Sequence, residues 1–299
     1  MLTNDLFVLG ATGFVGGAVV DAALRDGLQV GAWARSEAQA ADLRRRGVAV
    51  SAPSSIPPSK IVIDLIQPKL PKRLTNAAFE TATRYRVDTT RAVLQALPPG
   101  ALLFSVSGVD DFEGDVVSHQ SRFFTGNPKG FARIGLNVRA EVLASKRAFA
   151  SIHLGTVYGP GKAFAATLFP QLAKGRLPVV GNGANRMPLI HVEDAARALV
   201  HLSRLTTEQL TLHPWIVTDG SATTQRELLE LGAKLLGGPR PKSVPRWLAS
   251  LVAGSVGAAT FSRDVPTDPS ALVATGFTFR FPTIATGLPD SIAHLEVAT

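Results

Sequence analysis

The chain has 299 residues, of which 45% are hydrophobic and 18% charged, and its formal net charge is +8. This length and apolar content suffice for a sizeable buried core. The absence of cysteine excludes disulfides, thiolate catalysis and cysteine-ligated metals, and the six histidines show no metal-ligand spacing. Because the lysines and arginines are scattered rather than gathered along one face, the charge favours anionic small ligands over nucleic acid.

We expect neither a leader nor an integral membrane segment. The first apolar run begins at Leu6, which leaves no room for a signal peptide before it. The longest uncharged stretch, from Trp247 to Ser262, contains Ser and Gly and is too short to span a bilayer. We interpret it as a buried or interfacial helix, with peripheral membrane contact as a lesser alternative, and we expect a cytoplasmic protein.

A glycine triplet lies between a predicted strand and a predicted helix. Leu6 to Leu9 is an apolar run typical of a buried parallel strand, and residues 15–24 have a helical pattern. Glycines at this junction allow a tight turn, close approach of a pyrophosphate, and close packing of the helix on the strand. The free amides of the first helical turn then face the anion. We interpret the loop as a dinucleotide site rather than an ordinary turn, with Gly10, Thr12, Gly13, Phe14, Val15 and Gly16 as the expected cofactor-contacting residues.

Arg35 follows the second predicted strand, residues 29–34. In dinucleotide folds an acidic residue at this point binds the ribose 2′-hydroxyl and favours NAD. An arginine instead offers donors to a 2′-phosphate. Arg35 therefore favours NADP(H) over NAD(H), the alternative being a solvated arginine at a strand end.

Further alternation of strands and helices predicts an α/β fold, a Rossmann-type doubly wound parallel sheet. We expect a helix over 36–46, strands over 48–51, 60–66 and 101–106, and a long helix over 74–97. Ligands in such sheets bind beyond the carboxyl ends of the strands. Gly10, Arg35, Asp64, Leu65 and Ser107 all lie at such ends, and Asp64 is expected to meet a partner or lie at the open end of its strand. Residues 1–162 form the predicted NAD(P)-binding domain, and residues 163–299 mostly a smaller substrate lobe interleaved with it.

Several motifs resemble the extended short-chain dehydrogenase/reductases, the NAD(P)-dependent epimerase/dehydratase family. These motifs are GATGFVGG at residues 10–17, SIHLGTVYGPG at 151–161, LPVVGNGANRMPLIHVEDAARALVHL at 177–202, WIVTDGSATTQRELLELGAKLLG at 215–237 and SVPRWLASL at 243–251. The third motif is similar to the substrate-lobe hairpin and following helix of that family. The resemblance implies an oxidoreductase or epimerase that binds a nicotinamide dinucleotide and a small-molecule substrate.

The family's catalytic tyrosine, and the lysine four residues after it, are missing from this chain. By the resemblance, Ser107 stands at the catalytic serine position, and Asp88 where a helix asparagine is expected. Counting back from Tyr158 places Phe131 and Gly135 at the tyrosine and lysine positions. Counting back from Glu141 instead places Arg133 and Asn137 there, and neither register restores the pair.

Other polar residues are candidates to replace the missing pair or to bind substrate. The acidic segment 110–115 follows Ser107, and crowded carboxylates can raise one pKa, although a solvated loop is the preferred interpretation. His119 and Arg122 lie where the family contacts substrate. Arg186 resembles the arginine with which nucleotide-sugar members bind a diphosphate, the alternative being a hairpin turn with a solvated arginine.

The sequence thus predicts an NADP(H)-binding oxidoreductase or epimerase-like protein that acts on a small metabolite through a nonstandard site. Two alternatives stay open: a noncatalytic dinucleotide-binding sensor or regulator, and a nonredox enzyme of cyclase or lyase type on the same fold. No metal is expected, and the sequence leaves open whether the protein is a homodimer.

Overall fold

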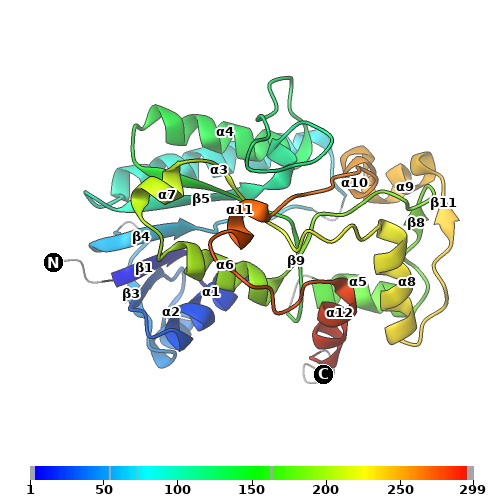
Figure 1. Cartoon of the computed structure of the whole chain (residues 1–299), viewed down its shortest axis with the longest axis horizontal. Coiled ribbons are helices and arrows are strands. Elements are labelled where there is room, and N and C mark those ends of the chain that lie inside the picture. Colours follow the sequence, from blue (N-terminus) through cyan, green and yellow to red (C-terminus); the bar gives the residue numbers. More distant parts are fainter. Residues whose placement is uncertain (1–3, 54, 72, 162–163, 295–299) are drawn as a thin grey trace.

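A parallel sheet of seven strands, in the order β10-β6-β5-β4-β1-β2-β3, organises the chain (Figure 1). The computed structural model describes residues 4–53, 55–71, 73–161 and 164–294. The strands are β1 (Asn4–Leu9), β2 (Val30–Trp33), β3 (Ala49–Ser51), β4 (Ser59–Asp64), β5 (Leu102–Gly108), β6 (Phe149–Leu154) and β10 (Trp215–Val217). This topology confirms the predicted Rossmann-type fold.

Helices cover both faces of the sheet (Figure 1). One face carries α1 (Phe14–Arg25), α2 (Glu37–Arg45) and α6 (Val192–Leu202), and the other carries α3 (Asn76–Ala96) and α4 (Gly130–Ala144). Residues of β1 alternate between two hydrophobic clusters: Leu6 and Val8 pack with α1 and α6, whereas Phe7 and Leu9 pack with α3 and α4. Both faces of β1 are therefore buried, as its continuous apolar run predicts.

A smaller lobe lies beyond the carboxyl ends of the strands. It holds α5 (Phe164–Ala173), β8 (Val179–Val180), α8 (Gln225–Leu235), β11 (Ser243–Val244), α9 (Arg246–Ala253), α10 (Ser255–Phe261) and α12 (Ile284–Ala293). The hairpin expected within residues 177–191 is wrong. β8 pairs in parallel with β11, while β9 (Leu189–His191) pairs in parallel with β7 (Thr156–Tyr158), because partners distant in sequence supply the backbone hydrogen bonds.

The chain returns to the main sheet after entering this lobe. α6, α7 (Thr207–Thr211) and β10 follow β9, and α11 (Ser270–Val273) packs against β10. The predicted domain boundary between residues 162 and 163 lies outside the described residues. The division of the chain into two domains at this point therefore stays a prediction.

The expected helix over 247–262 is divided into α9 and α10 at Gly254. Its φ of +83° suits glycine, and a side chain there would overlap the carbonyl of Leu74. Several apolar side chains of α9 are exposed to solvent rather than buried. Within the described ranges, no helix is both long and apolar enough to cross a bilayer.

Candidate functional site

The glycine loop forms a tight turn from β1 into α1. Gly10 has a φ of +82°, and a Cβ there would lie 2.7 Å from the carbonyl oxygen of Leu65. A Cβ on Gly16 would overlap the Gly10 carbonyl, so α1 packs on the turn only because residue 16 is glycine. Among the described residues no side chain caps the amino end of α1. The first-turn amides are thus available to an anion.

A groove of about 410 Å³ begins at this loop. It runs past Thr12, Gly13 and Phe14 to the segment after β7 and the start of α6. Phe14 closes one side, because its ring would lie 3.2 Å from a Cβ on Gly161. The glycine loop, α1, the segment after β7 and the start of α6 therefore line a groove beside the uncapped first turn of α1.

Arg35 lies immediately after β2, on the exposed surface next to the start of α2. Its backbone amide donates to the side chain of Gln39, and Ser36 caps α2 through the amide of the same Gln39. No carboxylate within the described ranges pairs with the Arg35 guanidinium. The side chain is therefore free to meet an anion at the carboxyl end of β2.

Asp64 forms a buried ion pair at the end of β4. Its Oδ2 accepts a hydrogen bond from Arg86 of α3 at 3.0 Å, and its Oδ1 accepts from the amide of Ile66 at 3.1 Å. The strand expected to reach Ile66 ends at Asp64, because the carboxylate turns the chain there. Asp64 and Leu65, predicted as cofactor contacts, lie next to the glycine loop. Leu65 donates its amide to the carbonyl of Leu9 and lies against Gly10.

Ser107 and Asp111 meet the backbone of α4 at Gly135. A Cβ on Gly135 would overlap both Ser107 Oγ and the carboxylate oxygens of Asp111. Asp111 is only 1% exposed, and neither of its oxygens has a hydrogen-bond partner among the described residues. The carboxylate therefore occupies the space in which a side chain at position 135 would begin.

His153 of β6 lies behind this carboxylate. Its Nδ1 is 3.3 Å from Asp111 Oδ2 and 3.2 Å from the Gly108 carbonyl oxygen, while Nε2 is 2.8 Å from Ser151 Oγ. Both neighbours of Nδ1 are hydrogen-bond acceptors, and Ser151 Oγ lies within hydrogen-bonding distance of Nε2. The buried cluster thus joins a carboxylate to an imidazole at the carboxyl ends of β5 and β6.

Arg139 supplies positive charge near the same carboxylate. It lies one turn after Gly135 on α4, and its guanidinium carbon stands 3.9 Å from the centre of the Phe123 ring. Burial lowers the pKa of Arg139, and the charge of Asp111 opposes that effect. Ser107, Asp111, His153 and Arg139 therefore form one cluster, hereafter the Ser107 cluster.

The acidic segment 110–115 is packed into the protein in its first half, whereas residues 113–115 are exposed, as expected of a solvated loop. Val109–Asp111 forms a short 3-10 turn, and Asp110 pairs with Arg263 at 3.0 Å. Burial is the main reason that the pKa of Asp110 is raised, with Arg263 opposing and Asp111 adding to the rise. Crowding of carboxylates is thus the smaller cause, because the turn is packed into the protein.

The four α4 residues that the two registers place at the tyrosine and lysine positions have different neighbours. Gly135 faces Ser107, whereas Phe131 packs edge-on against Phe79 of α3 at 5.1 Å between ring centres. Arg133 pairs with Glu80, and Asn137 donates to the carbonyl of Arg133 along the helix. No tyrosine or lysine lies in α4 under either register.

Asp88 lies away from the Ser107 cluster. Its side chain is 75% exposed and lies 3.6 Å from Arg91 on the outer face of α3. The buried positions nearest to it on that helix are Arg86 and Thr90. The structure therefore gives Asp88 no contact with Ser107.

The three residues predicted to contact substrate have different surroundings, and their role stays a prediction. His119 stacks near His213, which precedes β10, at 5.0 Å between ring centres. Arg122 is exposed on the loop before α4. Arg186 is not in a hairpin turn, and its partly exposed guanidinium binds both oxygens of Asp264, at 3.0 and 2.6 Å, so its charge is already matched.

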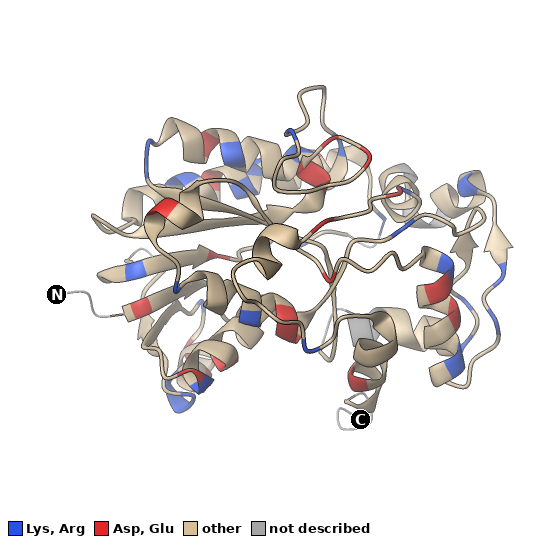
Figure 2. Cartoon of the chain, viewed as in Figure 1, with Lys and Arg blue, Asp and Glu red and all other residues tan. Residues whose placement is uncertain are grey.

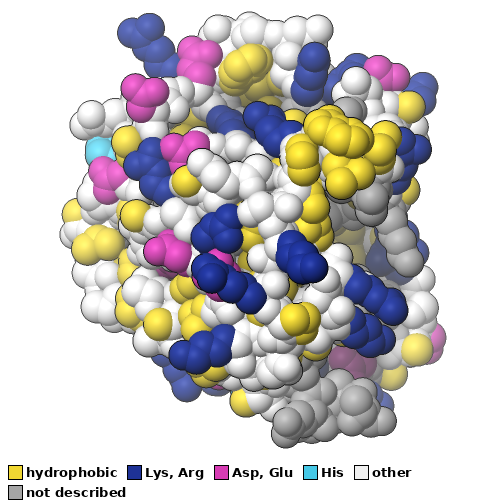
Figure 3. Space-filling model, turned by 90° about the vertical axis from the view of Figure 1, so that its right-hand side faces the viewer, with side chains coloured by type: hydrophobic (Ala, Val, Ile, Leu, Met, Phe, Trp, Pro, Cys, Tyr) yellow, Lys and Arg dark blue, Asp and Glu magenta, His cyan; other side chains and the backbone are white. Residues whose placement is uncertain are grey.

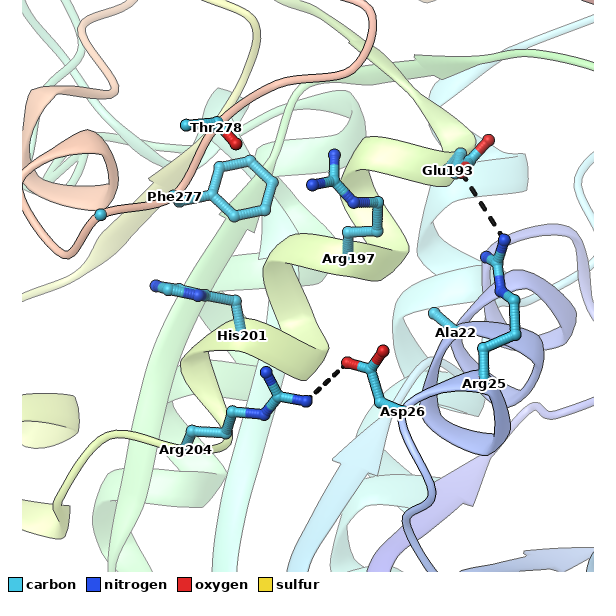
Figure 4. Close-up of a pocket in the computed structure, with 10 residues that line it drawn as sticks. Ala22, Arg25, Asp26, Glu193, Arg197, His201, Arg204, Phe277 and Thr278 are labelled. Carbon is cyan, nitrogen blue, oxygen red and sulfur yellow. Dashed lines mark hydrogen bonds and ion pairs between the residues drawn. The ribbon is translucent and has the colours of Figure 1, made fainter.

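A second cleft, of about 340 Å³, lies between the carboxyl-terminal part of α1, α6 and residues 276–278 (Figure 4). Its arginines already have carboxylate partners. Arg204 binds Asp26 at 2.6 Å, and Arg25 lies 3.7 Å from Glu193. The cleft adjoins the groove at the glycine loop, because Arg25 and Glu193 line both, but it is lined by the last turns of α1 rather than by the uncapped first turn, so we do not assign the cofactor to it. Within the described ranges no group of side chains could hold a metal ion.

Sequence reasoning missed Arg86 and the pairing of Asp111 with His153. Asp111 comes four residues after Ser107, and His153 lies in a strand that is otherwise mostly apolar. A polar residue inside an apolar strand signals a buried partner, but the pairing itself crosses 42 positions of sequence, from Asp111 to His153.

The fold and the glycine loop define a Rossmann-type α/β protein. A sequence model of the NAD dependent epimerase/dehydratase family matches residues 136–211, and this match confirms the resemblance read from the motifs over that segment. No curated protein sequence matches the chain.

Solved structures of the extended short-chain dehydrogenase/reductase group share the fold. The human epimerase family protein SDR39U1 (isoform 2), solved with NADPH, is 20% identical with a TM-score of 0.74, over 96% of this chain and 99% of that one. MoeE5, solved with UDP-glucose and NAD, is 21% identical with a TM-score of 0.74, over 98% and 99%. The UDP-glucuronic acid 4-epimerase of Bacillus cereus, solved with UDP-glucuronic acid and NAD, is 13% identical with a TM-score of 0.76, over 98% and 99%.

Proposed function

We propose that this protein is an NADP(H)-dependent oxidoreductase or epimerase-like enzyme that acts on a small metabolite through a nonstandard site. The observation that carries the proposal is the uncapped amino end of α1, which follows the close-packed turn at Gly10 and Gly16 and lies beside a groove. The amides of such a helix end bind the pyrophosphate of a dinucleotide.

Arg35 supports the choice of NADP(H). Its guanidinium is exposed at the end of β2, where the adenosine ribose lies in dinucleotide folds, and no described carboxylate competes for it. A 2′-phosphate placed there would accept hydrogen bonds from the planar guanidinium. The NADPH in the human relative is consistent with this choice, whereas the NAD in the two nucleotide-sugar proteins is not.

The Ser107 cluster supplies the proposed chemistry on the protein side. A bound nicotinamide donates or accepts hydride. Ser107 would hold the oxygen of a carbonyl or alcohol through a hydrogen bond, and Asp111 would exchange a proton in place of the absent tyrosine. His153 would stabilise the negative charge of Asp111, because its Nδ1 lies 3.3 Å from that carboxylate.

The test is NADPH oxidation against a panel of aldehydes, ketones and nucleotide sugars, with NADPH affinity measured separately by calorimetry. We expect turnover with a subset of the panel, and a loss of about 10- to 1,000-fold in kcat for Ser107→Ala and for Asp111→Asn with NADPH affinity kept. Ser203→Ala is the matched control, since Ser203 is distant on the end of α6 and donates only to the Val200 carbonyl.

Two outcomes would move the assignment elsewhere. Tight NADPH binding without turnover on the whole panel would favour a noncatalytic sensor or regulator. Catalysis that needs no dinucleotide would favour a nonredox enzyme of cyclase or lyase type. Because the proposed cofactor is a metabolite of the cytoplasm, we place the protein there, and a homodimer stays a prediction for sedimentation analysis.

A further inference from the structure

α9 exposes a patch of large apolar side chains on the outer end of the smaller lobe. The exposed fractions are 68% for Trp247, 38% for Leu248 and 61% for Leu251. Trp247 and Leu251 are four residues apart and therefore lie on one side of the helix. Figure 3 shows hydrophobic side chains gathered at one place on this end of the molecule, with Lys and Arg around them. We call Trp247, Leu248 and Leu251 the α9 patch.

The chain around the α9 patch carries positive charge only. Between Glu230 and Asp264 there is no acidic residue, and five basic residues occur: Lys234, Arg240, Lys242, Arg246 and Arg263. In Figure 2 the ribbon of α9 and the loop leading to β11 carry blue segments and no red ones, whereas α8 carries both. The local charge is therefore one-sided, unlike that of the rest of the protein.

A second segment adds to this charge. Gly175 lies against Pro239, which brings residues 174–176 beside the chain that leads into β11. Five exposed basic side chains on these segments have no carboxylate partner among the described residues: Lys174, Arg176, Lys234, Lys242 and Arg246. Their positive charge is thus not neutralised within the protein.

We propose that the α9 patch, with these five basic residues, docks the protein on an anionic phospholipid bilayer. A tryptophan and leucines on one face of a helix insert at the boundary of headgroups and acyl chains. Exposed lysines and arginines on the same lobe are attracted to the negative surface of such a membrane. The inference does not depend on the proposed function.

Charge decides between a bilayer and a second copy of the chain. Two copies joined through the α9 patch would bring two sets of unneutralised basic residues together, and this repulsion opposes such a dimer. An anionic surface has the opposite effect, and the net charge of +8 adds to the attraction.

The experiment is cosedimentation of the full chain with vesicles of phosphatidylcholine alone or with about 30% phosphatidylglycerol, at low and high salt. We expect binding to the anionic vesicles at low salt that weakens at high salt, and little binding to the neutral ones. Tryptophan fluorescence gives a second readout. Of the three tryptophans, Trp215 is 3% exposed and Trp33 donates its indole to Ser55, so only Trp247 is positioned to enter lipid. Its emission should shift to the blue and be quenched by brominated lipid.

Matched variants separate the two contributions. We expect Trp247→Ser/Leu251→Ser and Lys242→Glu/Arg246→Glu each to lower vesicle affinity at least about fivefold. Leu143→Ser/Leu212→Ser removes leucines that are 51% and 77% exposed elsewhere, and Arg44→Glu/Arg45→Glu changes the net charge equally on α2; both should bind like wild type.

Three results would overturn the proposal: no binding to anionic vesicles at low salt, equal binding to neutral vesicles, or equal losses in the control variants. A dimer that Trp247→Ser/Leu251→Ser dissociates, without vesicle binding, would likewise overturn it and assign the α9 patch to self-association.

Discussion

The carboxylate of Asp111 fills the space beside Gly135 in which any other residue would place its Cβ. The absence of a side chain at Gly135 of α4 and the position of the Asp111 carboxylate, in the 3-10 turn Val109–Asp111, thus depend on each other. The missing side chain at position 135, which looks like a loss in the sequence, is what lets Asp111 approach Ser107 and His153.

Gly135→Ala tests this relationship. The added methyl group would push Asp111 and Ser107 out of place, and overpacking of this kind costs about 1–3 kcal/mol of unfolding free energy. The same change made in an Asp111→Ala background should cost less, because one of the two obstructing groups is gone. Urea unfolding of the four proteins of this double-mutant cycle measures the coupling, and additive losses would show that the two residues do not share this space.

The glycine loop predicts opposite results for two neighbouring glycines of α1. Gly16→Ala places a methyl group on the Gly10 carbonyl, so we expect a stability loss of at least about 2 kcal/mol and loss of dinucleotide binding. For Gly17→Ala the new Cβ lies an ordinary 3.7 Å from the Ala11 carbonyl, and the higher helix propensity of alanine makes the change neutral or slightly stabilising. Thermal unfolding with and without NADPH compares the two, and similar behaviour of both variants would contradict the packing argument.

Arg35→Ala should separate the two nicotinamide nucleotides. We expect about 10- to 100-fold weaker NADPH binding and less than about threefold change for NADH, since only NADPH carries the 2′-phosphate. Arg45→Ala, on the same side of the sheet but paired with Asp42, is the control and should leave both affinities unchanged. Equal losses of NADPH and NADH in Arg35→Ala would remove the phosphate argument while leaving dinucleotide binding intact.

Asp219, at the end of β10, makes stability depend on pH. Burial raises the pKa of its carboxyl from 3.8 to about 6, although hydrogen bonds from Ser221 oppose the rise. The folded protein therefore binds this proton more tightly than the unfolded chain. The stabilisation is fully present below about pH 4 and is lost as the pH rises through about 6.

Asp219→Asn should accordingly stabilise the protein at pH 8, by up to about 3 kcal/mol, and change stability little at pH 4. The amide oxygen can still accept from the Ser221 amide. Asp268→Asn is the matched control, because Asp268 accepts from the amide of Ser270 in the same local arrangement at a less buried position. Calorimetric melting at both pH values measures the effect, and a gain that is the same at pH 4 and pH 8 would argue against a buried charge.

The buried pair of Asp64 and Arg86 predicts a further stability result. Asp64→Ala leaves the guanidinium of Arg86 buried without its partner, which costs about 3–5 kcal/mol. Asp64→Leu/Arg86→Met removes both charges and should recover most of that loss. Denaturant unfolding compares the variants. A double variant no more stable than Asp64→Ala would mean that the pair is held for its hydrogen bonds rather than for charge balance.

The local elements were largely predictable, because they depend on neighbouring residues. The apolar run of β1, the glycines after it and the arginine after β2 follow one another within 35 residues. At the start of α8, Thr224 and Glu227 three residues later form a capping box, which this spacing indicates in the sequence. Each of these signals acts through backbone conformation or through hydrogen bonds inside one turn.

What the sequence by itself determined was the Rossmann-type sheet and its dinucleotide loop, since periodicity and glycine spacing act over short stretches of chain. Only the tertiary structure decided which polar groups meet. Asp64 pairs with Arg86, Asp111 lies against His153, and Arg186 pairs with Asp264. β8 pairs with β11 instead of forming a hairpin. The physical reason is that a buried charge or an open backbone edge must find some partner, but which partner it finds depends on how distant segments pack.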